Sequence, residues 1–124
     1  MSVLAIARMG HPVLLQRAAE VEDVSGPQIR ELLHNMRETL AQSGGVGLAA
    51  PQVHVPLRVF LYSVPPARSE GEDDPPRAVQ ALINPILEPD GPDTVQRIEG
   101  CLSIPGFRGE VPRYRRVRYS GWDE

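Results

Sequence analysis

The chain has 124 residues, of which 41% are hydrophobic and 23% are charged, and its formal net charge is −3 at pH 7. This composition predicts one small globular domain and disfavours a general nucleic-acid binder. The sequence holds no apolar run long enough to cross a membrane, and residues 1–8 lack the basic leader of a signal peptide. The lone cysteine, Cys101, excludes an internal disulfide, so a reducing cytosol is the expected compartment.

A helix is the first clear element in the chain. Ser25 and Gln28 have the spacing of a capping box, and Pro27 falls in the first turn, where a missing N–H costs nothing. Apolar residues then recur at helical spacing and form one stripe: Ile29, Leu32, Leu33, Met36 and Leu40. Gly44 and Gly45 are typical of a left-handed cap, so we expect the helix to end there.

The rest of the chain predicts short strands separated by turns. The expected strands are residues 57–62, 81–84, 94–97 and 113–122. We expect Pro85 to end the second of them, and residues 63–80, with four prolines, to form a surface loop. That loop also carries an acidic cluster: Glu70, Glu72, Asp73 and Asp74. One amphipathic helix with short strands predicts a single α+β domain over residues 1–124, built on antiparallel sheet.

The segment Gly45–Gln52 is small and apolar up to its final glutamine. Its glycines allow another backbone to approach closely, and Gln52 offers a neutral hydrogen-bond donor. Such a donor suits one half of an oxyanion hole. The same residues also suit a helix cap followed by a buried strand, and composition alone favours this simpler interpretation.

A second segment, Glu99–Ser103, places the only cysteine between a glycine and a leucine. A thiolate at Cys101 could bind a transition metal or act as a nucleophile. The commoner alternative is a buried free cysteine that behaves as a small hydrophobe.

Taken together, Gly45-x-Gly-x-Ala-Ala-Pro-Gln52 and Glu99-Gly-Cys-Leu-Ser103 resemble the first two signature motifs of the peptide deformylase family, in the family's order and spacing. The resemblance covers nearly the whole chain. It extends to further segments: Gly10–Leu14, Ile29–Leu40, Ile83–Pro85, Ile104–Gly106 and Val111–Arg113. It implies an α+β fold with short antiparallel strands in small sheets packed around helices.

The resemblance implies a metal hydrolase that removes the formyl group from N-terminal formyl-methionine. The family uses a divalent metal, usually iron(II), for which zinc, nickel or cobalt can substitute, and Cys101 matches the cysteine ligand. The other two ligands are histidines of a His-Glu-x-x-His helix, whose glutamate is the general acid/base. The metal lowers the pKa of its bound water, and the resulting hydroxide attacks the formyl carbon.

The resemblance also assigns the residues around the substrate. The Gln52 side chain and the backbone N–H of Leu102 are expected to donate hydrogen bonds to the oxyanion. Val46, Gly47 and Gly100 are expected to pair with the substrate backbone like an added strand. Val46 is further expected to line an apolar methionine pocket.

No His-Glu-x-x-His motif follows. The histidines are His11, His34 and His54, and none is expected to bind metal. We therefore expect the domain to be incomplete at its C-terminus, without the metal-binding helix, and to expose the apolar faces that this helix covers. The chain alone is expected to be marginally folded, to hold a metal poorly and to have little or no deformylase activity.

Two other interpretations remain open. One is a naturally short, catalytically inactive relative that binds N-terminal peptides. The other is an RNA- or ribosome-binding module built on basic residues near the C-terminus: Arg108, Arg113, Arg115, Arg116 and Arg118. The acidic net charge favours a solvated strand face over this module. The expected partners are N-formylmethionyl peptides and the ribosome exit region, with no membrane and no specific nucleic acid, in the bacterial cytoplasm.

Overall fold

The computed structural model describes residues 2–72 and 74–124. Met1 and Asp73, the latter in the predicted acidic cluster, lie outside the described residues. The helices are α1 (Pro12–Leu15) and α2 (Pro27–Ser43), with 3-10 turns η1 (Ala50–Val53) and η2 (Pro66–Arg68). The strands are β1 (Gly47–Ala49), β2 (Val59–Val64), β3 (Arg77–Pro89), β4 (Thr94–Gly100), β5 (Arg108–Tyr114) and β6 (Val117–Trp122).

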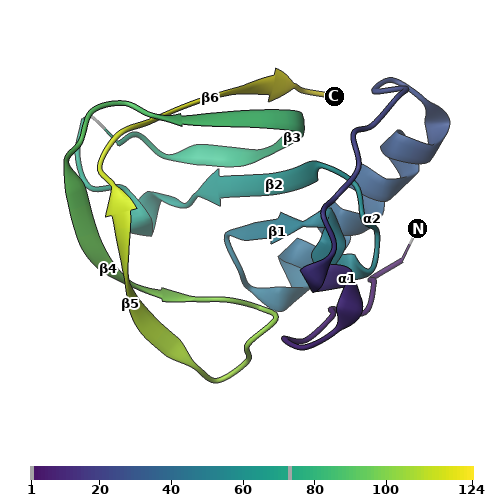
Figure 1. The fold of residues 1–124 in the computed structure, drawn as a ribbon, viewed down its shortest axis with the longest axis horizontal. Coiled ribbons are helices and arrows are strands. Elements are labelled where there is room, and N and C mark those ends of the chain that lie inside the picture. Colours follow the sequence, from purple (N-terminus) through teal and green to yellow (C-terminus); the bar gives the residue numbers. More distant parts are fainter. Residues whose placement is uncertain (1, 73) are drawn as a thin grey trace.

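The strands form two antiparallel sheets. The larger has the order β1-β2-β3-β6, and the smaller is the two-stranded β4-β5 ribbon, which curves away from it (Figure 1). The predicted α+β class, with short antiparallel strands in small sheets packed around helices, is confirmed. Because β1 ends one side of the larger sheet and β4 pairs with β5 alone among the described residues, each has an edge to which none of them adds a strand.

Helix α2 packs against the larger sheet and closes the core. Its predicted stripe is confirmed, since Ile29, Leu33, Met36 and Leu40 are buried and Leu32 is packed against them. They contact the buried sheet residues Leu48, Val59, Leu61, Ala81 and Ile83, which belong to the same cluster. The first motif follows α2 directly, so the core also fixes the position of that motif.

The ends of α2 show one confirmed prediction and one error. Gly44 is the C-cap, with a left-handed φ of 75°, as predicted. The capping box is wrong, because the N-cap is Gly26, which has no side chain to accept a hydrogen bond. The Ser25 hydroxyl instead lies 3.4 Å from a carboxylate oxygen of Asp23.

Pro85 does not end a strand as predicted, because β3 runs through it from Arg77 to Pro89. A register irregularity between Ile83 and Ile86, where β3 pairs with β6, accommodates the proline. Asn84 takes a left-handed φ of 53° at this point. Its side chain accepts from Val21 N–H at 2.8 Å and donates to Val21 C=O at 3.0 Å. These two hydrogen bonds connect the segment before α2 to strand β3.

Other predicted boundaries shift. The strand predicted over residues 57–62 begins two residues later, at Val59, and continues into the predicted loop 63–80, which also contains η2 and the start of β3. The strand predicted over residues 113–122 is wrong, because a turn at residues 115–116 divides it between β5 and β6, which belong to different sheets.

Large apolar side chains are exposed on β3, β4, β6 and the turn after the second motif. They include Ile86, Leu87, Ile98, Phe107, Val117, Tyr119 and Trp122. Apolar surface is therefore exposed, and the expectation that a further helix covers it stays a prediction. Among residues 2–72 and 74–124, no helix combines the length and the apolar character needed to cross a membrane.

Ion pairs hold the β4-β5 ribbon in place. Within it, Arg113 of β5 donates two hydrogen bonds to the Glu99 carboxylate of β4, at 2.9 and 2.6 Å. These bonds hold the pKa of Glu99 below its usual value. From outside the ribbon, Glu70 accepts from both terminal nitrogens of Arg97, which attaches the loop after η2 to β4.

Replacing Asn84 tests the clamp on the segment before α2. Asn84→Ala should lower the free energy of unfolding by about 3 kcal/mol, from two lost hydrogen bonds and a left-handed backbone that alanine disfavours. Asn84→Gly loses the same hydrogen bonds without the backbone penalty, so it should be about 1 kcal/mol less destabilising than alanine. Urea unfolding measures both. Equal effects of the two variants would contradict the role assigned to the backbone.

The lowered pKa of Glu99 makes its contribution dependent on pH. A carboxyl with a lowered folded pKa stabilises above its unfolded pKa of about 4.3 and loses this contribution as pH falls through the folded value. Glu99→Gln should therefore cost up to about 1 kcal/mol at pH 7, because the pair is solvent-accessible, and nothing below the folded pKa. Urea unfolding across pH measures this, with the exposed Glu31→Gln as control. A constant difference at all pH values would refute it.

Candidate functional site

The Gln52 side chain has a fixed orientation. Its Oε1 accepts from the backbone N–H of Ala49 at 2.9 Å. Because a backbone N–H can only donate, this end of the carboxamide must be the oxygen. The amide nitrogen, Nε2, therefore points away from Ala49 as a donor, and the 3-10 turn η1 that carries Gln52 holds it there.

That nitrogen reaches the second motif. Nε2 donates to Ser103 Oγ at 3.0 Å and lies 3.7 Å from Cys101 Sγ. A neutral sulfur is a weak acceptor, so the N–H directed toward Cys101 can exchange it for an oxygen. The structure thus brings the predicted residues Gln52 and Cys101 together, with a donor beside the thiol.

The N-terminal segment supports both motifs from the backbone. Ala7 N–H donates to Gln52 C=O at 2.7 Å, and Met9 N–H donates to Ser103 C=O at 2.8 Å. Ala7 and Ser103 are both buried. Three consecutive residues therefore set the separation between the motifs.

The free edge of β1 presents backbone groups beside these side chains. Val46 C=O accepts from Ser63 N–H at 2.8 Å, so this carbonyl faces β2. Backbone groups alternate in direction along an antiparallel strand, so those of Gly47 face the free edge. Ala49 N–H, two residues on, bonds to Gln52 and confirms this alternation. Gly47 can therefore pair with an added strand, whereas the Val46 carbonyl is already occupied.

An open groove of about 870 Å³ runs along this edge and joins the motifs. Its lining includes all the predicted site residues: Val46, Gly47, Gln52, Gly100, Cys101 and Leu102. Gly45 lies close to this wall, since a Cβ on it would lie 3.1 Å from Leu102 Cδ1 and would require the leucine side chain to shift. The Leu102 side chain packs against the core, and no described residue accepts a hydrogen bond from its backbone N–H.

The donor set does not suffice for a metal ion. Cys101 is a free, exposed thiol. In the part of the chain that the structure describes, no three His, Cys, Asp or Glu side chains gather as a ligand group. His34 contacts Glu38 at 3.3 Å, and His11 stacks edge-on against His54 with ring centroids 4.7 Å apart. A protein zinc site usually needs at least three protein ligands, so these residues do not hold a metal by themselves.

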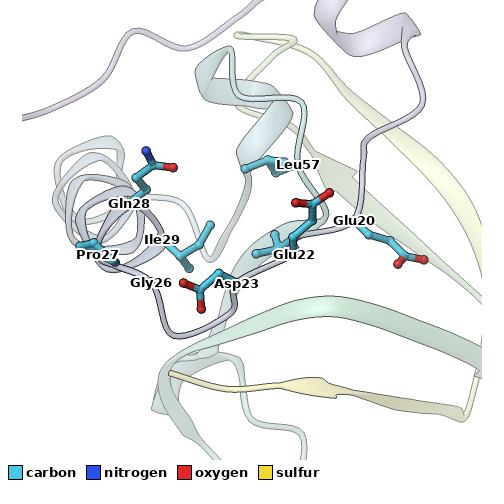
Figure 2. A pocket seen from close by; sticks show the side chains of 9 residues that line it. Glu20, Glu22, Asp23, Gly26, Pro27, Gln28, Ile29 and Leu57 are labelled. Carbon is cyan, nitrogen blue, oxygen red and sulfur yellow. The ribbon is translucent and has the colours of Figure 1, made fainter.

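A second hollow, of about 550 Å³, lies at the start of α2 (Figure 2). Three carboxylates line it, from Glu20, Glu22 and Asp23, together with apolar residues such as Ile29 and Leu57. Among the described residues that line it there is no cysteine or histidine, and its carboxamide comes from Gln28, outside both motifs. The groove beside Gln52 is therefore the better candidate site.

The basic residues near the C-terminus are divided between two sheets and the turn that joins them. All five are exposed, but Arg108 and Arg113 lie on β5 and Arg118 on β6, in different sheets. Arg113 is also paired with Glu99. This arrangement does not favour the RNA-binding interpretation.

Sequence reasoning missed the residues that support Gln52. The sequence carries no chemical signature for Ala49 N–H or for the N-terminal segment, because both act through backbone groups that every residue type has. The serine ending the second motif was the single available signal.

Comparison with known proteins identifies the family. The polypeptide deformylase family model matches residues 3–124. "Peptide deformylase 1" of Bordetella pertussis is 45% identical over 120 residues, which cover 96% of this chain and 67% of the relative. A relative from Nitrosomonas europaea with the same description is 44% identical, covering 95% of this chain and 66% of its own length. The chain thus spans about two thirds of the length of these relatives.

Solved structures agree. The peptide deformylase of Ehrlichia chaffeensis superposes with a TM-score of 0.87 at 34% identity, covering 98% of this chain and 69% of the other. The Met-Ala-Ser-bound class I type b enzyme of Acinetobacter baumannii gives 0.85 at 30% identity, covering 98% of this chain and 77% of the other. Fold, family model and relatives agree: the chain belongs to the polypeptide deformylase family, a family of enzymes.

Proposed function

We propose that this chain serves in removing the formyl group from N-terminal formyl-methionine, by supplying the peptide groove and the hydrogen-bond donors of the reaction. One observation carries the proposal: the Gln52 amide joins the two motifs across a groove with a free strand edge. A related structure from Acinetobacter baumannii with bound Met-Ala-Ser supports a peptide as the occupant.

In this proposal, the substrate backbone pairs with Gly47 at the edge of β1 and passes Gly100 of β4. The Val46 side chain lies against the methionine. The formyl oxygen takes the place of the Cys101 sulfur as acceptor from Gln52 Nε2, and the Leu102 N–H donates to the same oxygen. Two donors fixed in advance stabilise negative charge on that oxygen without reorganisation during the reaction.

Family membership implies a divalent metal, which we propose to be iron(II), and Cys101 is the one ligand that we assign to this chain. Since the described residues supply no further ligand set, deformylation needs additional ligands beyond these. Because the named relatives are bacterial, we infer action in the bacterial cytoplasm, on nascent chains near the ribosome exit.

Peptide binding tests the proposal. Titrating the isotope-labelled chain with formyl-Met-Ala-Ser should shift the NMR signals of the Gly47, Gly100 and Leu102 amides and of the Gln52 side chain. Unformylated Met-Ala-Ser should perturb Gln52 and Leu102 less, because it lacks the carbonyl that they bind. Shifts confined to other parts of the chain would refute the proposed groove.

Replacing the donor tests the role of Gln52. Gln52→Glu keeps an oxygen for Ala49 N–H but removes the amide donor, so formyl-Met-Ala-Ser should bind about tenfold more weakly, the equivalent of one lost hydrogen bond. Gln80→Glu makes the same change at an exposed site outside the groove and should leave the affinity unchanged. Equal affinities of wild type and Gln52→Glu would show that Gln52 does not contact the formyl group.

The ligand set predicts how the 124 residues behave with metal. Under anaerobic conditions with added iron(II), the purified chain should bind the ion weakly, because a single thiolate is a poor metal site. It should release no measurable formate from formyl-Met-Ala-Ser. Formate release and metal content after desalting measure the two effects. Substantial turnover by the pure chain would show that other residues complete the metal site.

A further inference from the structure

The groove carries positive charge on a chain that is acidic overall. Three charged side chains line it: Arg68, Glu99 and Arg108. The Glu99 carboxylate is already occupied by two hydrogen bonds from Arg113. No carboxylate of the described residues lies within ion-pair distance of Arg68 or Arg108, so both guanidinium groups remain available to a ligand.

The ribbon directs Arg108 toward the second motif. Arg108 lies directly opposite Gly100 in the β4-β5 register. A Cβ on Gly100 would lie 3.8 Å from Arg108 Cγ, so the arginine stem occupies the space beside this glycine. Arg108 therefore lies beside the residue that precedes Cys101.

Arg68 reaches the groove from a separate element. It ends the turn η2, where its N–H donates to Pro65 C=O at 2.9 Å. Two residues later, Glu70 is bound to Arg97 of β4 through both carboxylate oxygens. This ion pair attaches the η2 segment to the strand that forms one wall of the groove.

We propose that Arg68 and Arg108 select peptides that carry an acidic side chain shortly after the formyl-methionine. This inference rests on the proposed function, since it assumes that the groove holds such a peptide. Guanidinium groups bind carboxylates by charge-assisted hydrogen bonds. The exposed apolar side chains of Ile98 and Phe107 also line the groove and can pack against the aliphatic part of such a side chain.

The test compares amidated peptides, formyl-Met-Ala-Glu-amide and formyl-Met-Ala-Gln-amide, by calorimetric titration of the chain. The glutamate peptide should bind about 3–10-fold more tightly at low salt, and the ratio should approach one at about 0.5 M salt because exposed charges are screened. Arg68→Gln and Arg108→Gln should each reduce the ratio. Arg30→Gln, which removes an exposed arginine of α2 outside the groove, should leave it unchanged.

Each other outcome decides against the inference in a distinct way. Equal affinity for both amidated peptides would overturn the selectivity and leave the proposed function standing. If neither peptide bound to the chain, both the proposed function and this inference would be overturned. If formyl-Met-Ala-Gln with a free C-terminus gained affinity while the glutamate amide did not, the arginines would recognise a chain terminus instead of a side chain.

Discussion

The carboxamide of Gln52 connects two segments that lie 49 residues apart in the chain. Its oxygen is held by Ala49 N–H within its own turn, and its nitrogen is directed at Ser103 and Cys101. A side chain bonded at one end only could rotate and present either atom to a ligand. Because both ends are fixed, the groove has a donor of known position, and its other features are arranged around it.

The surrounding fold serves to hold that donor rigid. Helix α2 and the larger sheet bury the core directly before the first motif, and the left-handed Gly44 turns the chain into β1. The β4-β5 ribbon carries the second motif to the same place, braced by the Glu99–Arg113 and Glu70–Arg97 pairs. The position of the first motif therefore depends on core packing, whereas the position of the second motif depends in part on ion pairs. The position of the second motif should respond more to pH and salt.

The sequence predicted best what depends on local periodicity or on a dense motif. The stripe of α2 and its glycine cap follow from spacing and from backbone preference at single positions. The two motifs were recognised because together they resemble the signature motifs of the peptide deformylase family, whereas composition alone favoured a simpler interpretation of each. The strand through Pro85 was missed because Asn84 stabilises an irregularity there by bonding to Val21, 63 residues away. No local pattern reports such a contact.

The same reasoning explains what was missed at the site. Cys101 and Gln52 could be named from the sequence, but the Ser103 hydroxyl and the Ala7–Met9 backbone bonds that position them could not. Metal binding depends on the number of ligands, and the described residues offer Cys101 without a group of further ligands around it. The structure therefore accounts for binding and orientation of a peptide by these residues.

The most direct test of this account is a crystal structure of the chain with formyl-Met-Ala-Ser bound. The account predicts the formyl oxygen about 3 Å from Gln52 Nε2, with the peptide extended along the free edge of β1 and paired with Gly47. A peptide bound elsewhere, or one whose formyl group points away from Gln52, would contradict it.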